Sequence, residues 1–397
     1  MKVLIELADK SQCTGCAACV SVCPHHCIYM KKGMDGFLYP EIYTSHCISC
    51  GACERVCPIL NDFSKDNSIL GVYSAYSKND LLRISSSSGG IFSELATEFL
   101  NLGGVVYGAI YNTNGSVEHM GIENIDMLEK LRGAKYSQSW LGDTFKIIKE
   151  QLETGRNILF SGMPCQVAGL KAFLHQDYDN LFCIDFVCHG VPSADAWEKY
   201  IKYRAQIDNN GILPRYVNMR NKESGWSKYS YSIEMVYSNE KRYISKNCDD
   251  PFMNFFVGDY ILRKSCGNCH FKGFNRISDI TLGDFWGIWD IDSEMDDNKG
   301  TSLVLTHSSK GEELFRSILD NLKCKKATLE QAAKTNPSLV SSSIHKANRD
   351  ELLKDLMKND FKSTLNLLQS TDNRHKSLLS NMRKILSIIK GDRKDAS

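Results

Sequence analysis

The cysteines between residues 13 and 58 constrain the fold most strongly, because the same phrase occurs there twice. The first copy, CTGCAACVSVCP, starts at Cys13, and the second, CISCGACERVCP, starts at Cys47. Each reads C-x-x-C-x-x-C-x-x-x-C-P, the run that binds 4Fe-4S cubanes in bacterial-type ferredoxins. Three closely spaced thiolates can hold one cubane, while the proline directs the fourth cysteine to the other. The ligands predicted for the first cluster are Cys13, Cys16, Cys19 and Cys57, and those for the second are Cys47, Cys50, Cys53 and Cys23.

Zinc knuckles or a disulfide framework are the alternatives for this region. Zinc sites use C-x-x-C pairs rather than triplets followed by C-P, and the phrase repeats in full, so the cubane interpretation is favoured. Cys27 lies outside both copies and is expected to be a small buried residue. Short strands at 28–30 and 36–40, around a turn, complete a small dicluster ferredoxin fold over residues 1–60. Exchange of the fourth ligands would hold the two clusters close, so that electrons could pass between them.

Composition and charge set the class of protein. The chain has 397 residues, enough for two or three domains, and its 42% hydrophobic and 24% charged content is ordinary for a soluble globular protein. A net charge of +1 gives no electrostatic reason to expect nucleic-acid binding. Since thiolate-bound iron requires a reducing compartment, we expect a cytoplasmic protein. The first residues do not resemble a signal peptide, and no run reaches the ~20 apolar residues that cross a bilayer.

Beyond residue 72, predicted strands alternate with predicted helices, which indicates an α/β core. The pattern predicts strands at 73–76, 105–111, 157–160 and 181–187, and helices at 91–99, 142–154 and 164–174. Residues 229–237 alternate with period two and can pair with 242–245 as a hairpin, and 280–284 and 302–306 are two further strands. The expected fold class is therefore mixed α/β (α+β), with antiparallel additions to a larger body behind the small ferredoxin fold.

The expected domain plan is a ferredoxin unit at 1–60, a linker at 61–71, a body at 72–345 and a helical, basic tail at 346–397. Residues 374–394 hold seven Lys and Arg residues among apolar residues at helical spacing. Such a helix could lie on an anionic membrane surface, dock on a partner, or pack on its own domain.

Four later cysteines occur in unusual settings. Cys165 follows a predicted strand at the first turn of a helix, where the helix dipole favours thiolate. Cys188 ends another strand, and Cys266 and Cys269 form a C-x-x-C. These four could ligate a third iron–sulfur cluster, since sites in α/β sheets gather at the carboxyl ends of strands. A four-cysteine zinc site, a redox-active C-x-x-C and buried structural cysteines are the open alternatives. His189 could protonate a substrate or simply cap its loop.

Glycine-rich phrases suggest a second kind of site. Ser87-Ser88-Gly89-Gly90 lies at a predicted helix start, where free N–H groups can bind phosphate, although a serine-rich cap is the alternative. Together with GAKY at 133–136, GDFWG at 283–287 and KGTS at 299–302, it could line a pocket for an aromatic, phosphorylated cofactor.

The sequence resembles the coenzyme F420 hydrogenase/dehydrogenase beta subunits over residues 1 to about 320. The resemblance rests on SSGG at 87–90, GAKY at 133–136, GMPCQ at 162–166, CHG at 188–190, C-x-x-C at 266–269 and DITLGDFWG at 279–287. It implies an FAD-binding body with its own 4Fe-4S cluster, ligated by Cys165, Cys188, Cys266 and Cys269. The residues that it implies as flavin contacts are Ser87, Ser88, Gly89, Gly90, Lys135, Tyr136, Gly162 and Asp284.

The function expected from these features is that of an iron–sulfur flavoprotein oxidoreductase. FAD would connect the one-electron chemistry of the clusters to a two-electron substrate. Lys135 could stabilise the reduced flavin or bind a phosphate. The expected partner is a redox protein or a small-molecule electron donor or acceptor. Two other interpretations stay open: a non-catalytic electron-transfer subunit of a larger redox complex, and a zinc-stabilised binding module built on Cys266 and Cys269.

Overall fold

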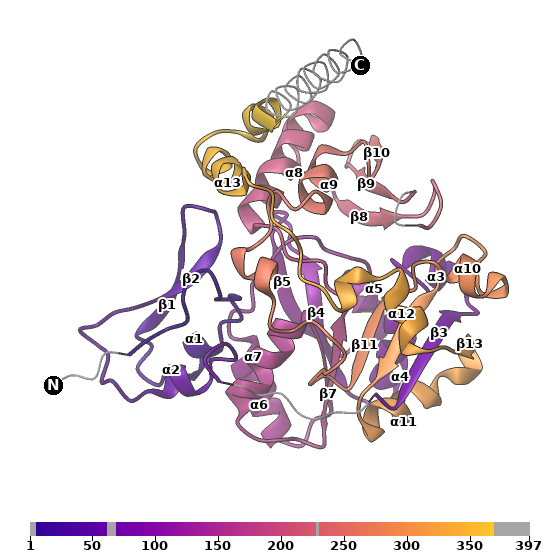
Figure 1. Ribbon diagram of the computed structural model, residues 1–397, viewed down its shortest axis with the longest axis horizontal. Coiled ribbons are helices and arrows are strands. Elements are labelled where there is room, and N and C mark those ends of the chain that lie inside the picture. The colour runs from indigo at the N-terminus through magenta and orange to yellow at the C-terminus, as the bar shows by residue number, and fades with distance from the viewer. Residues whose placement is uncertain (1–4, 62–68, 228–229, 369–397) are drawn as a thin grey trace, which may run out of the picture.

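An eight-stranded mixed sheet organises the body of the molecule (Figure 1). The computed structural model describes residues 5–61, 69–227 and 230–368. The strand order is β13-β3-β12-β11-β7-β6-β4-β5, in which the neighbours β11, β7, β6 and β4 run parallel and the other pairs are antiparallel. The strands are β3 (Gly71–Ser77), β4 (Val105–Tyr111), β5 (Val117–Ile122), β6 (Ile158–Ser161), β7 (Leu181–Phe186), β11 (Ile280–Asp284), β12 (Ser302–Thr306) and β13 (Leu322–Lys326).

Helices cover both faces of this sheet, because its central strands are apolar on both sides. All residues of β6 and β12 are buried, as expected for strands between two helical layers. The helices of the body are α3 (Asp80–Ser85), α4 (Ile91–Asn101), α5 (Leu128–Leu131), α6 (Thr144–Glu153), α7 (Pro164–Leu174), α10 (Ile288–Ile291), α11 (Ser309–Ser317) and α12 (Leu329–Lys334).

A smaller lobe sits at one end of the body. Its three-stranded antiparallel sheet has the order β10-β9-β8, with β8 (Tyr216–Asn221), β9 (Ser232–Val236) and β10 (Arg242–Lys246). The helices α8 (Ala194–Asn209), α9 (Pro251–Val257) and α13 (Arg349–Lys358) pack on it through a core rich in aromatic residues. The chain reaches α13 only after crossing the front of the body from α12 (Figure 1).

The ferredoxin unit consists of α1 (Ala18–Val22), β1 (Ile28–Lys32), β2 (Leu38–Ile42) and α2 (Ala52–Arg55), with β1 and β2 antiparallel. It packs against the body rather than standing apart (Figure 1). Phe37 and Tyr39 are buried in the core of the smaller lobe beside Trp197. Ala18 and Val56 belong to the core formed by α6, α7 and β6. Burial of large side chains of this kind stabilises the docked arrangement by about 1.5–3 kcal/mol per residue.

Most of the elements expected from the sequence are confirmed, and the fold is mixed α/β with a ferredoxin-like N-terminal unit. The helix 164–174 and the strands 280–284 and 302–306 have the expected bounds, and β9 pairs with β10 as the expected hairpin. The strands β5, β8 and β13 and the long helix α8 were not expected, and neither were several short helices, among them α3, α9 and α11. The basic helix at 374–394 and most of the linker at 61–71 lie outside the described residues. Within those residues, every helix is too short or too polar to cross a bilayer.

Candidate metal centres and cofactor cradle

One cavity in the ferredoxin unit contains all four cysteines predicted for the first cluster. Cys13, Cys16, Cys19 and Cys57 line it together with apolar residues that include Leu7, Met30 and Ile59. Burial, together with the charges of Cys13 and Cys57, raises the pKa of Cys16 to about 11. The Cys16 thiol therefore stays protonated near neutral pH without a metal, and a metal must displace its proton. Four thiols around one apolar cavity fit a cubane.

The cysteines predicted for the second cluster also gather, but nearer the surface. Cys23 and Cys53 share a small buried core, and Cys47 packs against it. Cys50 is exposed. Cys27 is buried as expected, and its sulfur lies only 3.3 Å from that of Cys23, so it directly neighbours a predicted ligand.

The third group of cysteines comes from three separate segments that meet beside the carboxyl ends of β6 and β7. Pro192 pairs with Leu262, and Arg263 N–H donates to Val191 O at 2.9 Å, which brings the segment after Cys188 beside Cys266. Burial raises the pKa of Cys165, and the charges of Cys188, Cys269 and Cys266 raise it further. Burial thus outweighs the helix dipole that was expected to favour thiolate at Cys165.

The number of these thiols and the way they group bear on the kind of metal site. Among the described residues, no three His, Cys, Asp or Glu side chains are grouped as ligands of one metal ion. A cubane needs a wider arrangement, because each of its four cysteines binds a different iron atom. Cys165, Cys188, Cys266 and Cys269 together supply the four thiols that a cubane requires.

The first cavity and the third group of cysteines are neighbours. Gly169 lies one helical turn after Cys165 on α7, and α1 packs against this helix. A Cβ at Gly169 would lie 2.8 Å from Cys16 Cβ and 3.0 Å from Cys16 Sγ. The absence of a side chain at position 169 therefore lets a ligand of the first cluster approach the helix that carries Cys165.

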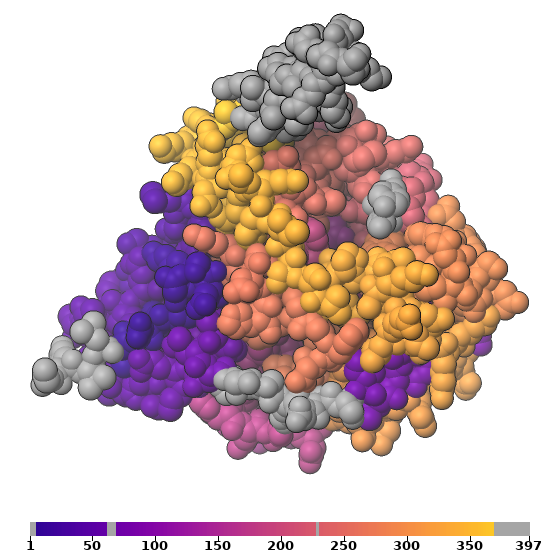
Figure 2. Space-filling model, in the orientation of Figure 1, coloured from indigo at the N-terminus to yellow at the C-terminus, as the bar shows by residue number. Residues whose placement is uncertain are grey.

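A segment beyond the expected motifs covers the C-x-x-C loop. Residues 338–345, here called the strap, cross the surface between α12 and α13, where Figure 2 shows orange and yellow chain over the middle of the molecule. Ser342 Oγ accepts from Cys269 N–H at 2.9 Å, and His345 Nε2 lies 3.0 Å from Lys264 O. Lys272 Nζ donates to Ser338 O at 2.7 Å and to Cys188 O. The run SSSIH at 341–345 was the available sequence signal, and it was not recognised.

His189 is held by its surroundings. Its Nε2 lies 2.7 Å from Asp259 Oδ1, and its ring contacts Phe256 edge to face at 5.3 Å. Its carbonyl accepts a hydrogen bond from Ser343 of the strap. One third of the side chain is exposed. These contacts orient the imidazole, and its role as a proton donor stays a prediction.

The glycine-rich phrases lie together at the same edge of the sheet. Ala134 N–H donates to Ser87 Oγ at 2.8 Å, and Gly89 N–H donates to Ser302 Oγ at 2.9 Å. A Cβ at Gly89 would lie 2.5 Å from Ala75 O, so only glycine fits there. Gly90 precedes α4 with φ of 88°, which places the SSGG phrase at a helix start as expected.

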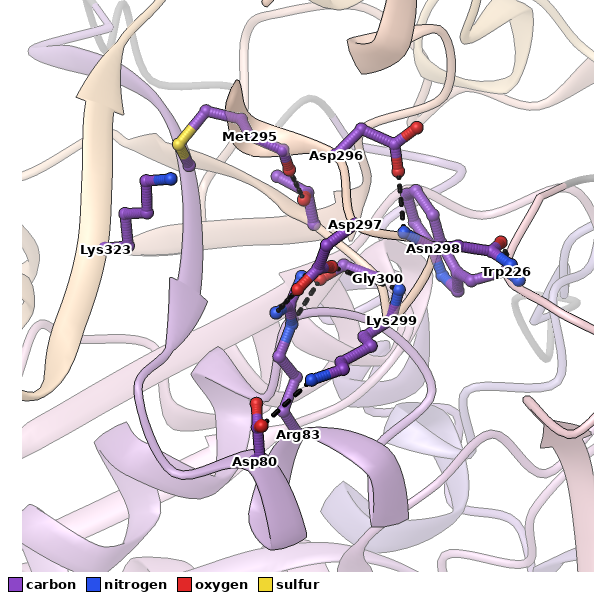
Figure 3. A network of polar contacts seen from close by, with 12 residues as sticks. Asp80, Arg83, Trp226, Met295, Asp296, Asp297, Asn298, Lys299, Gly300 and Lys323 are labelled. Carbon is purple, nitrogen blue, oxygen red and sulfur yellow. Dashed lines mark hydrogen bonds and ion pairs between the residues drawn. The ribbon is translucent and has the colours of Figure 1, made fainter. Parts of the chain in front are cut away.

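Two cationic side chains, those of Arg83 and Lys222, hold these loops in place through ion pairs and hydrogen bonds. Arg83 forms a two-pronged ion pair with Asp297, at 2.6 and 2.7 Å, and its Nε donates to Gly300 O at 2.8 Å (Figure 3). Lys222 Nζ donates to the carbonyls of Ser88 and Lys299, each at 2.6 Å. The positions of the SSGG and KGTS phrases are therefore fixed relative to each other.

Arg220 on β8 brings two of the expected flavin contacts together. Its Nη1 donates to Asp284 Oδ2 at 2.8 Å and to Tyr136 OH at 3.3 Å, and its guanidinium lies 5.0 Å from the Trp286 ring. Arg220 is 4% exposed, and its Nε and Nη2 and Asp284 Oδ1 have no hydrogen-bond partner among the described residues. Each such atom costs about 1–3 kcal/mol, so a ligand that offers oxygens to the Arg220 N–H groups and a donor to Asp284 Oδ1 would be stabilised here. These unpaired groups fit a flavin nucleotide.

The remaining expected contacts are less clearly available. Lys135 Nζ donates to the carbonyls of Lys130, Arg132 and Gly133 and so closes the end of α5. Burial lowers the pKa of Lys135 to about 7. Gly162 follows β6, and its N–H donates to Ile184 O at 3.1 Å.

Comparisons with known proteins agree with the motifs. Residues 155–332 match the family profile for the carboxy-terminal part of the coenzyme F420 hydrogenase/dehydrogenase beta subunit, and residues 12–60 match the 4Fe-4S dicluster domain. Among solved structures, a similar chain belongs to the F420-reducing NiFe hydrogenase complex from Methanosarcina barkeri. It is 16% identical, with a TM-score of 0.46, and the match covers 79% of this chain and 94% of that chain. No curated protein matches the sequence.

Proposed function

We propose that this iron–sulfur protein is a flavin-dependent oxidoreductase, because residues 155–332 match the profile of the coenzyme F420 hydrogenase/dehydrogenase beta subunit and residues 12–60 match the 4Fe-4S dicluster domain. In this proposal it carries three cubanes, two in the ferredoxin unit and one held by Cys165, Cys188, Cys266 and Cys269. FAD, when bound, would exchange single electrons with the clusters and an electron pair with a small substrate.

The observation that carries the proposal is the contact between the first cavity and α7. Cys16 adjoins Gly169, one turn from Cys165, so a cluster in the cavity would neighbour one on the body cysteines. The same edge of the sheet presents Asp284 at the end of β11 and the SSGG phrase after β3. This arrangement supports a path for electrons from the ferredoxin unit to the cofactor cradle.

The residues of the chain have distinct roles in the proposal. Arg220, with Asp284 and Tyr136, binds and orients the cofactor through its unpaired N–H groups. The SSGG phrase offers its amides to phosphate. His189 holds a proton at Nε2 beside Asp259, next to the ligand Cys188.

The test is metal and flavin analysis of one anaerobically purified sample. Three cubanes require about twelve irons per chain, and the cradle requires one FAD. About eight irons, one zinc and no flavin would overturn the proposal and favour a zinc-stabilised binding module.

A pair of cysteine variants sharpens this test. Cys165→Ser is expected to lose about four irons, because one cubane loses a ligand. Cys183→Ser is the control, since Cys183 is buried within β7, and it should keep all the iron. Equal iron content in the two variants would remove Cys165 from the metal site.

A second candidate function is that of an electron-transfer subunit without its own substrate. The outer end of the ferredoxin unit favours it, because Cys50 is exposed there and Ile48 and Tyr43 are 62% and 51% exposed. A redox partner could approach the second cluster at this surface. Anaerobic affinity purification should then recover a stoichiometric partner, and deletion of residues 374–397 should release it if the basic tail is the docking helix.

A further inference from the structure

Arg263 is buried completely at the junction of the ferredoxin unit and the body. On the ferredoxin side, its Nε donates to Cys13 O at 2.7 Å and its Nη2 donates to Leu38 O at 2.9 Å. The same Nη2 lies 3.7 Å from Cys13 Sγ, within reach of a hydrogen bond to sulfur. Its guanidinium is therefore in direct contact with a ligand of the first cluster.

The backbone of Arg263 joins the third group of cysteines. Its N–H donates to Val191 O, three residues after Cys188, and its carbonyl accepts from Cys266 N–H at 2.9 Å. One residue thus spans two metal centres, with its side chain on the first and its main chain on the third.

The charge of Arg263 has no carboxylate counter-ion within the described part of the chain. Other buried arginines face carboxylates, as Arg83 faces Asp297 and Arg220 faces Asp284. Around Arg263, the described residues supply two carbonyls, the amide oxygen of Gln138 at 2.9 Å, the Cys13 sulfur and the rings of Tyr39 and Phe37. A buried cation is strongly disfavoured unless a negative charge accompanies it.

We propose that Arg263 is the counter-ion of the first cluster and raises its reduction potential; this rests on the cluster assignment in the proposed function. A cubane with four thiolate ligands is negatively charged and gains one more negative charge on reduction. A nearby guanidinium stabilises the reduced form more than the oxidised form, so the potential rises. An electron that reached the ferredoxin unit would then reside on the first cluster in preference to the second.

Gly15 makes this contact geometrically feasible. It has φ of +72°, and a Cβ there would lie 2.9 Å from Arg263 Nη1 and 2.6 Å from Gln138 Nε2. In the second copy of the motif, Ser49 occupies the equivalent position. The repeat is therefore open to a guanidinium in its first copy only.

The experiment is a redox titration followed by electron paramagnetic resonance, on anaerobic wild type, Arg263→Gln, Arg263→Lys and Arg349→Gln. Arg349 is the matched control because it is equally buried at the same junction, donating to Leu262 O at 2.6 Å and lying 3.7 Å from Asp35, without touching a cluster cysteine. We expect Arg263→Gln to shift the midpoint potential of one cluster to a more negative value and leave the others unchanged. Arg263→Lys, which keeps the charge, should have a midpoint potential close to that of the wild type. Arg349→Gln should leave all potentials unchanged. Identical titrations for Arg263→Gln and wild type would overturn the proposal, as would an equal shift in Arg349→Gln.

A measurement on the wild type decides the matter if Arg263→Gln does not fold. Protein grown with guanidino-¹⁵N arginine should show a weak ¹⁵N coupling to the reduced first cluster in pulsed resonance spectra. Its absence would overturn the contact. Iron and flavin counts on the same sample separate this result from failure of the proposed function. About eight irons and no flavin would contradict the proposed function. The first cluster belongs to the dicluster domain, so its potential would still test the role of Arg263.

Discussion

The two copies of the cysteine phrase have the same spacing but opposite surroundings. In the first copy, Cys13 and Cys16 are less than a tenth exposed, and they pack into the cores of the smaller lobe and of α7. In the second copy, Cys50 is exposed and Ile48 beside it is 62% exposed. A repeated motif therefore specifies what is bound, whereas the residues around each copy decide which copy packs against the body and which is exposed.

The difference originates in single positions between the cysteines. Gly15 and Ser49 are equivalent, and both have positive φ, of 72° and 59°. Gly15 admits Arg263 and Gln138 of the body against the loop, whereas the equivalent position in the second copy carries the side chain of Ser49. The substitutions below test this comparison, from the largest expected effect to the smallest.

Gly15→Val should separate the ferredoxin unit from the body. Its Cβ would meet Gln138 and Arg263 at less than 3 Å, and a β-branched residue is strained at this φ, so a loss of about 3 kcal/mol or more in unfolding free energy is expected. Iron content and thermal unfolding are the measurements. Gly103→Val is the control, because Gly103 has φ of +77° with open space around it and reports backbone strain alone. Equal losses in the two variants would mean that the contact with Arg263 is not tight.

Gly169→Ala tests how closely Cys16 approaches α7. The sign of the resulting change in unfolding free energy gives the answer. In a helix free of contacts, alanine in place of glycine stabilises by about 1 kcal/mol. Here the new methyl would lie 2.8 Å from Cys16 Cβ, so we expect a net loss of about 1–2 kcal/mol. Denaturant unfolding of the iron-loaded protein measures it, and a gain in stability would contradict the close packing.

Gln138→Ala removes a bridge that is present only at the first copy. Gln138 accepts from Arg263 Nη1 at 2.9 Å and donates to Thr14 O at 3.2 Å. The expected loss is about 1 kcal/mol, the value of ordinary hydrogen bonds, with a matching fall in the thermal midpoint. Gln206→Ala, at an exposed position of α8, is the control and should change stability little.

Ser49→Gly should change the unfolding free energy least, and it should stabilise the protein rather than destabilise it. Serine in the left-handed region is strained, so glycine should stabilise by about 0.5–1 kcal/mol, less the entropy that glycine loses on folding. The potential of the second cluster should not change. A clear loss of stability would show that the serine side chain makes a contact that the comparison between the two copies does not include.

The sequence allowed prediction wherever the signal was local. Cysteine spacing predicted the four thiols of the first cavity, and Pro164 together with an apolar run located α7 to the residue. The strands β11 and β12 are short apolar runs between polar turns, which is why their bounds were also correct. At the two edge strands of the sheet, the sequence pattern does not identify a strand. The strand β13 reads LKCKK and β5 reads VEHMGI, since an edge strand tolerates polar residues.

The residues that join distant segments could not be found this way. Arg263 bonds to Cys13 across 250 positions, and Arg220 bonds to Asp284 across 64. The residues next to each arginine in the sequence do not identify its partner. The pairing depends on how the ferredoxin unit and the smaller lobe dock on the body. Lys135 is easier to notice because it belongs to a family phrase. Its ammonium donates to the carbonyls of its own loop, and its contact with flavin stays a prediction.

The strap has a consequence for how the protein is assembled. It closes over Cys266 and Cys269 through Ser342, Ser343 and His345, and it is translated after every cysteine of the three centres. While the ribosome is still making residues 338–345, the body cysteines have been synthesised and their cover has not. A cluster held by these cysteines, as proposed, would therefore lie beneath a segment that is the last of the contacting segments to be synthesised.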